Sequence, residues 1–126
     1  MRLQLRLSQE AKIILEREKL KCLENGKATT YGDIIDYISI NFQNRLSQID
    51  WLLVKNHKIY ENVVSSYTSL SPTTLTLSDT SMLVLDELTE ILNGLLLMKR
   101  TVYRSFAVRM ILKAYALEQK NINISY

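Results

Sequence analysis

The chain has very few of the residues that break helices or cross-link a fold. In 126 residues it contains one cysteine, Cys22, one proline, Pro72, and three glycines. A single cysteine excludes an internal disulfide and any metal site built on two cysteines of this chain. Scarce proline and glycine, with abundant leucine, isoleucine, glutamate and lysine, favour helix. We therefore expect one compact, mainly helical domain.

Long apolar runs are also absent. No uninterrupted apolar stretch approaches the roughly 18 residues of a membrane-spanning helix. The residues after Met1 alternate polar and apolar types, so they lack the apolar centre of a signal peptide. These absences predict a soluble, cytoplasmic protein with no membrane partner.

Groups suited to catalysis or metal binding are sparse. His57 is the only histidine, and no cysteine pair accompanies it. We therefore expect His57 to be a hydrogen-bonded residue at the edge of the core rather than a ligand or pH switch. No glycine-rich phosphate loop or activated nucleophile is evident, so we expect neither enzymatic activity nor a cofactor or metal.

Positive charge is scarce in one part of the chain and concentrated in another. The formal net charge is +3 and the isoelectric point is about 9.0. The segment Asn62 to Met98 contains no lysine or arginine, whereas Lys99 to Leu117 contains five basic residues and no acidic one. This distribution permits a nucleic-acid partner but does not establish one.

Two short segments, at residues 2–7 and 73–77, alternate leucine with polar residues. Strict alternation predicts a strand with its leucines on one side. One isolated strand cannot satisfy its backbone or bury its leucines, so the two segments are expected to form an antiparallel pair. The polar face of this two-stranded ribbon would then carry Arg2, Gln4, Arg6, Thr74 and Thr76.

Each predicted strand precedes two predicted helices. In the first half, Ser8 can cap a helix from Gln9 to Asn25 that ends at Gly26. Thr29 or Thr30 can cap a second helix, and its apolar positions follow helical spacing. These positions are Tyr31, Ile34, Ile35, Ile38 and Phe42.

The second half repeats this order. Ser78 can open a helix with Val84, Leu88, Ile91 and Leu95 on one face, which Asn93 and Gly94 interrupt. Thr101 can then cap a last helix, with Tyr103 and Phe106 at the start of its apolar stripe. Ser8 and Ser78 are 70 residues apart, as are Leu5 and Leu75, while Tyr31 and Tyr103 are 72 apart. The repeat predicts a strand-helix-helix unit used twice, as in a fused pseudo-dimer.

Between the two units, apolar residues recur at helical spacing and predict an amphipathic connector helix over residues 44–64. They are Leu46, Ile49, Leu53, Tyr60 and Val64. Trp51 lies off this stripe, so it either covers a neighbouring unit or forms a surface for a protein partner. The expected organisation is a first unit at 1–43, a helical connector and loop at 44–71, a second unit at 72–118 and a tail at 119–126, all in one compact domain.

This order of elements resembles the ribbon-helix-helix family, which includes the Arc and MetJ repressors. The turn Glu24-Asn25-Gly26-Lys27, followed by two threonines, is also similar to the family's turn before its second helix. The resemblance covers residues 2–42 and 73–117, and both units in one chain are similar to tandem members associated with plasmid conjugation. It implies a ribbon that enters the DNA major groove, with bases contacted by Arg2, Gln4, Arg6, Thr74 and Thr76.

The resemblance also implies phosphate contacts at the start of each unit's second helix. In the first unit the residues are Lys27, Thr29 and Thr30, and in the second they are Lys99, Arg100 and Thr101. A helix N-terminus favours an anion, which explains cations placed there. Because the two halves differ, the expected DNA site is asymmetric rather than palindromic.

The sequence thus predicts a sequence-specific double-stranded DNA-binding protein, with a transcriptional repressor or a plasmid or phage accessory factor as the role. An accessory protein of a relaxosome at a conjugative origin would use the same residues. The alternative from another class is a helical inhibitor or adaptor that acts through the connector helix. Because both strands lie in one chain, a monomer can already contain the complete ribbon.

Overall fold

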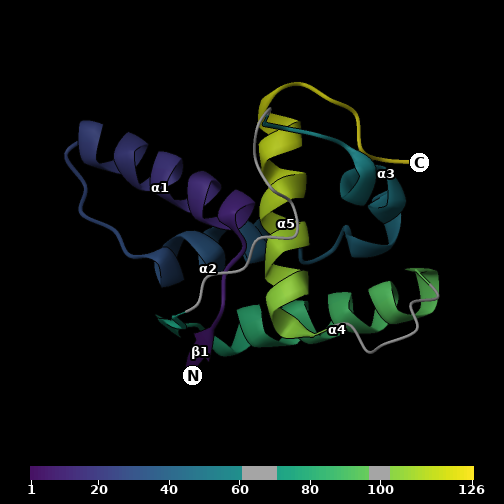
Figure 1. The fold of residues 1–126 in the computed structure, drawn as a ribbon, viewed down its shortest axis with the longest axis horizontal. Helices are drawn as coiled ribbons and strands as arrows, with labels where there is room; N and C mark the ends of the chain where they lie inside the picture. The colour runs from purple at the N-terminus through teal and green to yellow at the C-terminus, as the bar shows by residue number, and fades with distance from the viewer. Residues whose placement is uncertain (61–70, 97–102) are drawn as a thin grey trace.

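The structure, a computed structural model, describes residues 1–60, 71–96 and 103–126 (Figure 1). The described elements, in order, are β1 (Arg2–Leu5), α1 (Gln9–Glu24), α2 (Tyr31–Phe42), the 3-10 turn η1 (Leu46–Gln48), α3 (Trp51–Asn56), β2 (Thr73–Thr76), α4 (Asp79–Leu96) and α5 (Arg104–Gln119). The described fold is mainly helical with one two-stranded sheet, as the sequence predicts.

The two strands pair with each other although they come from opposite halves of the chain. They are antiparallel, with Arg2 opposite Thr76, Leu3 opposite Leu75, Gln4 opposite Thr74 and Leu5 opposite Thr73. Leu7, Leu75 and Leu77 are buried, and Leu3 and Leu5 pack against the core. The predicted antiparallel ribbon within one chain is confirmed.

Three helices begin at the caps that the sequence predicts. The Ser8 hydroxyl accepts a hydrogen bond from the Ala11 amide at 3.1 Å, and the Ser78 hydroxyl accepts one from the Ser81 amide at 3.2 Å. Thr30 forms a capping box with Asp33 at the start of α2. Such caps replace the backbone partners that the first turn of a helix lacks.

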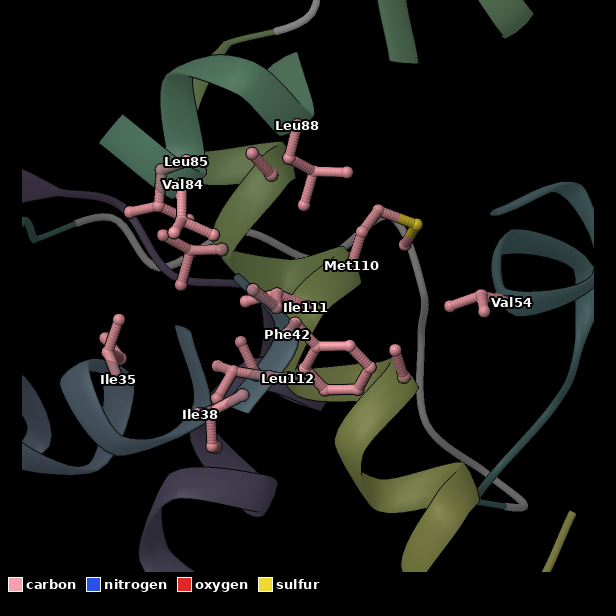
Figure 2. Packing of buried hydrophobic residues seen from close by; sticks show 14 of the residues in the cluster. Ile35, Ile38, Phe42, Val54, Val84, Leu85, Leu88, Met110, Ile111 and Leu112 are labelled. Carbon is pink, nitrogen blue, oxygen red and sulfur yellow. The ribbon is translucent and has the colours of Figure 1, made fainter. Parts of the chain in front are cut away.

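The core forms where α2 and α4 pack on α5, which runs through the middle of the molecule (Figure 1). Figure 2 shows apolar side chains from these helices, with one from α3, directed toward this region. They include Ile35, Ile38 and Phe42 of α2, Val84, Leu85 and Leu88 of α4, and Met110, Ile111 and Leu112 of α5. Each buried side chain of this size contributes about 1.5 to 3 kcal/mol of hydrophobic stabilisation.

Helices from the two halves are intertwined rather than packed as separate units. The contacts of α1 are mainly with α5, and those of α2 are mainly with α4 and α5. Neither half therefore buries its apolar faces by itself. The ribbon and the helical core are therefore both formed from the two halves of the chain.

The prediction of one connector helix over residues 44–64 is wrong within the described part. The chain forms the short turn η1, becomes extended at Ile49, and then forms α3, which ends at Asn56. The Asp50 amide donates to the Ile124 carbonyl at 2.7 Å, and Ile49 forms a β-bridge with Ser125. These bonds to the C-terminal segment use backbone groups that a continuous helix would need. Residues 61–64 lie outside the described ranges.

Trp51 is a core residue and does not form a partner surface. It is only 1% exposed, and its indole N–H donates to the Leu46 carbonyl at 2.9 Å. A buried indole needs such an acceptor. Residues of the predicted tail also take part in the fold, because Ile124 is buried beside this region.

Two predictions for the second half are wrong. Asn93 and Gly94 do not interrupt their helix, because α4 continues to Leu96; a glycine inside a helix only weakens it. Tyr103 does not lie on the core stripe: it is 67% exposed and precedes the first residue of α5. Since α5 starts later than predicted, Tyr103 lies outside the helix and its buried face.

Candidate nucleic-acid interface

The five predicted base-reading side chains lie together on one face of the ribbon. Each of Arg2, Gln4, Arg6, Thr74 and Thr76 is exposed, whereas the leucines between them point toward the core. We call this set the ribbon face. Its register places Arg2 across from Thr76 and Gln4 across from Thr74. Arg6 follows directly after β1 and continues the alternation.

The two strands give the ribbon face polar side chains of different length. β1 supplies arginine and glutamine, and β2 supplies only threonines. Side chains directly opposite each other on an antiparallel pair are about 4.5 to 5.5 Å apart at Cβ. The long polar groups of β1 therefore extend beyond the threonines and dominate what this face can contact.

The junction between the ribbon and α4 is held by Asp36 of α2. Its carboxylate accepts a hydrogen bond from the Ser78 amide at 3.0 Å and one from the Ser81 hydroxyl at 2.5 Å. At the same end of the ribbon, the Leu77 amide donates to the Met1 carbonyl at 2.9 Å. These bonds fix the end of β2 relative to both helices.

Gly32 is a further residue of this region that sequence reasoning missed. A Cβ at this position would lie 2.3 Å from the Thr76 carbonyl oxygen, so the start of α2 packs directly on the backbone of β2. The available signal was a glycine in the first turn of a helix with an otherwise strong apolar stripe. Only the absence of a side chain permits this approach.

The three predicted phosphate contacts of the first half lie on the turn before α2 or at its N-cap. Lys27 and Thr30 are exposed, and Thr29 is half-buried. The Thr30 hydroxyl accepts from the Asp33 amide at 3.1 Å, and the Thr30 amide donates to the Asp33 carboxylate at 3.2 Å. The carboxylate already satisfies one helix donor and adds negative charge where a phosphate would approach. The geometry here is that of a self-contained capping box.

The predicted phosphate contacts of the second half, Lys99, Arg100 and Thr101, lie outside the described residues. The described part of α5 begins after Tyr103 without a side-chain cap. Its first residue, Arg104, forms an ion pair with Asp86 of α4 at 2.9 Å.

Part of the basic segment is directed into the protein rather than toward a partner. Arg109 Nε lies 3.4 Å from Glu10 Oε1, and Lys113 Nζ lies 3.8 Å from the same oxygen. The Lys113 ammonium also donates to the Lys55 carbonyl at 3.1 Å. Burial lowers the pKa of Lys113, while the Glu10 carboxylate acts in the opposite direction. These two cations hold α5 against α1 and α3, so they add nothing to an outer basic surface.

His57 lies at the C-terminal end of α3, half-buried at the edge of the core. Its Nδ1 atom is buried and has no hydrogen-bond partner in the described part of the chain. The expectation of a hydrogen-bonded histidine therefore stays a prediction for this atom. Cys22 is a half-buried free thiol.

Within residues 1–60, 71–96 and 103–126, no group of three or more histidine, cysteine, aspartate or glutamate residues is placed to hold a metal ion. No helix in these ranges has both the length and the apolar character needed to cross a membrane. No protein-family model, curated protein or solved structure matches this chain.

Proposed function

We propose that the chain is a sequence-specific double-stranded DNA-binding protein that inserts its ribbon into the major groove. One observation carries the proposal: strands from opposite halves pair so that Arg2, Gln4 and Arg6 are exposed on the same face. The B-DNA major groove is wide enough to admit a two-stranded ribbon. Guanidinium, amide and hydroxyl groups are the side chains that recognise base edges there.

A tandem ribbon-helix-helix organisation is supported by the register of the ribbon. The residue 70 positions after Gln4 is Thr74, which is also its partner across the sheet. When two copies of the same strand pair about a two-fold axis, the residue at the axis lies opposite the equivalent residue of the other copy. The same offset relates Arg6 to Thr76, the partner of Arg2.

Helix packing gives independent support for the same pseudo-two-fold axis. Under the repeat, α1 corresponds to α4 and α2 corresponds to α5. The contact of α1 with α5 then corresponds to the contact of α4 with α2, and both are extensive. Two intertwined strand-helix-helix units, rather than an edge strand added to a helical bundle, account for this pattern.

The ribbon face favours recognition by β1. Arg2 and Arg6 can each donate two hydrogen bonds to guanine, Gln4 can pair with adenine, and Thr74 and Thr76 can contact a thymine methyl group. Arg2 and Arg6 are four positions apart, about 13 Å along a strand, which corresponds to about 4 base pairs. We expect an asymmetric site with a guanine toward each end and an adenine between them.

A transcriptional repressor and an accessory protein at a conjugative origin both remain proposals, because both roles use the same ribbon. The inhibitor or adaptor alternative would act through the connector helix. Burial of Trp51 and the short length of α3 give this alternative less support than the ribbon face gives DNA binding. DNA binding is therefore the function that the ribbon supports best.

The test is selection of duplexes from a randomised pool, followed by fluorescence anisotropy with the selected DNA at two salt concentrations. Arg6→Ala should weaken binding about 5- to 150-fold and relax the preference at one guanine. Lys55→Ala, which removes an exposed cation away from the ribbon, is the matched control and should keep the base preferences. Failure to select any duplex, or unchanged preferences in Arg6→Ala, would contradict the proposal.

A further inference from the structure

A basic hollow lies between α1 and the C-terminal end of α5. Its volume is about 220 Å³. Ile14 and Ala116 provide apolar lining, and Arg17, Lys21 and Lys120 provide cations. This hollow belongs to neither the ribbon face nor the start of α2. Its volume is below the roughly 300 Å³ at which small-molecule pockets begin, so it suits a side chain of a partner rather than a cofactor.

Tyr60 holds two of these cations beside the hollow. The Arg17 guanidinium lies 4.6 Å from the centre of the Tyr60 ring, and Lys120 Nζ lies 5.0 Å from it. The one lining carboxylate, Glu18, is bonded by Lys21 at 2.9 Å and by the Tyr115 hydroxyl at 3.3 Å. Positive charge therefore predominates around the apolar lining of the hollow. A partner that presents an apolar side chain surrounded by acidic residues would be complementary to it.

The outer face of α4 in this same chain carries exposed carboxylates around an apolar side chain, which is the combination that would complement the basic hollow. Asp79, Leu83, Glu87 and Glu90 are exposed there, at spacings that place them on one side of the helix. We call these four residues the acidic face. Leu83 is 71% exposed. No lysine or arginine occurs anywhere in α4, and Asp86 is bound by Arg104.

We propose that copies of this chain associate head to tail, with Leu83 of one copy in the basic hollow of the next. Asp79, Glu87 and Glu90 then lie against the cations around the hollow. The N-terminal end of α5 lies beside α4 (Figure 1), and Ala116 and Lys120 near its C-terminal end line the hollow. The two surfaces are therefore at opposite ends of α5. A contact between two different surfaces can repeat along a line, since it does not close on itself.

This association does not depend on the proposed DNA binding, because neither surface includes the ribbon face. Sedimentation velocity without DNA should show association that increases with protein concentration and weakens as salt is raised, since exposed charges are screened. Arg6→Ala should associate like the wild type. Loss of DNA binding and loss of self-association are therefore separable results.

The decisive test uses charge reversal on each surface. One variant carries Arg17→Glu with Lys120→Glu, and the other carries Glu87→Lys with Glu90→Lys. Each alone should raise the dissociation constant at least about tenfold, because like charges then face each other. Mixing the two should restore association, since each reversed surface then meets an opposite charge. Leu83→Ala should weaken association without changing the net charge.

Glu16→Lys with Glu24→Lys is the control, because it makes the same change in charge as the α4 variant on exposed positions of α1. Circular dichroism checks that every variant is folded. A wild type that remains monomeric at low salt would overturn the proposal. So would association unaffected by either reversal, weakened by only one of them, or not restored in the mixture of folded variants.

Discussion

Gly32 of α2 lies against the carbonyl oxygen of Thr76 in β2, and no side chain fits between them. A Cβ at Gly32 would be 2.3 Å from that oxygen and 3.3 Å from the Thr76 nitrogen and carbonyl carbon. All three neighbours are backbone atoms, so none can move aside without moving the strand. This contact fixes the distance between the start of α2 and the ribbon.

Gly32→Ala should therefore destabilise the protein although alanine favours helix. Forcing a methyl group into a packed contact costs about 1 to 3 kcal/mol, more than alanine gains in a helix. Urea denaturation should show a lower midpoint with little change in slope. An unchanged or higher midpoint would mean that α2 and β2 do not pack this closely.

Gly94→Ala is the matched control, and its effect should have the opposite sign. Gly94 lies within α4, and a Cβ there would meet nothing within 4 Å. Alanine should raise the free energy of unfolding by about 0.5 to 1 kcal/mol, because glycine loses more backbone entropy on folding. The same urea titration measures it. Destabilisation by Gly94→Ala would indicate that the helix is broken there, as the sequence alone suggests.

The sequence was sufficient to predict features that depend on local periodicity. Alternation of leucine identified both strands, and Ser8 and Ser78 marked helix starts that the structure has. The sequence left Thr29 or Thr30 as the cap of the second helix, and the structure has Thr30. The pairing of the two strands could also be predicted, because neither strand can bury its leucines alone. Exposure of the polar ribbon residues followed from the same alternation.

Features that depend on distant partners were not predictable in this way. Helical spacing from Leu46 to Tyr60 gave no sign that residues 48–50 bond to the C-terminal segment. The ion pairs of Arg109 and Lys113 with Glu10 were not predictable, because nothing local shows that Glu10 approaches from 99 or more residues away. The burial of Trp51 was likewise not predictable, because it depends on the Leu46 carbonyl, which accepts the hydrogen bond of the indole.

Glu10→Ala should strongly destabilise the fold by leaving buried cations without their carboxylate. The side chains of Glu10 and Lys113 are 6% and 3% exposed. Removing one partner of a buried ion pair costs about 3 to 5 kcal/mol. Replacing both, as Glu10→Leu with Lys113→Met, should recover much of this loss. Thermal and urea unfolding of both variants measure the difference, and equal losses in the two would contradict the pairing.

Asp36→Ala should weaken the junction between the ribbon and α4. It removes the acceptor of the Ser78 amide and the Ser81 hydroxyl, and bonds to a charged group contribute about 1.5 to 3 kcal/mol each. Asp36 is only half-buried, so the loss should be near the lower end. Asp36→Asn keeps one oxygen acceptor and should cost less. Amide hydrogen exchange at Ser78 should be faster in Asp36→Ala than in Asp36→Asn, and the reverse order would exclude this role.

Tyr115 makes the stability of the fold sensitive to alkaline pH. Burial, followed by the nearby Glu18 carboxylate, raises the pKa of Tyr115 to about 12 from 10.0. Above pH 10.0 the unfolded phenol loses its proton while the folded one retains it, so this contribution to stability is present below that pH and is lost toward pH 12. Tyr115→Phe, which cannot ionise, should show a smaller decline in the urea midpoint over this interval. Because Tyr60 also has a raised pKa, some decline should persist in the variant; identical profiles would show that Tyr115 is not protected from ionisation.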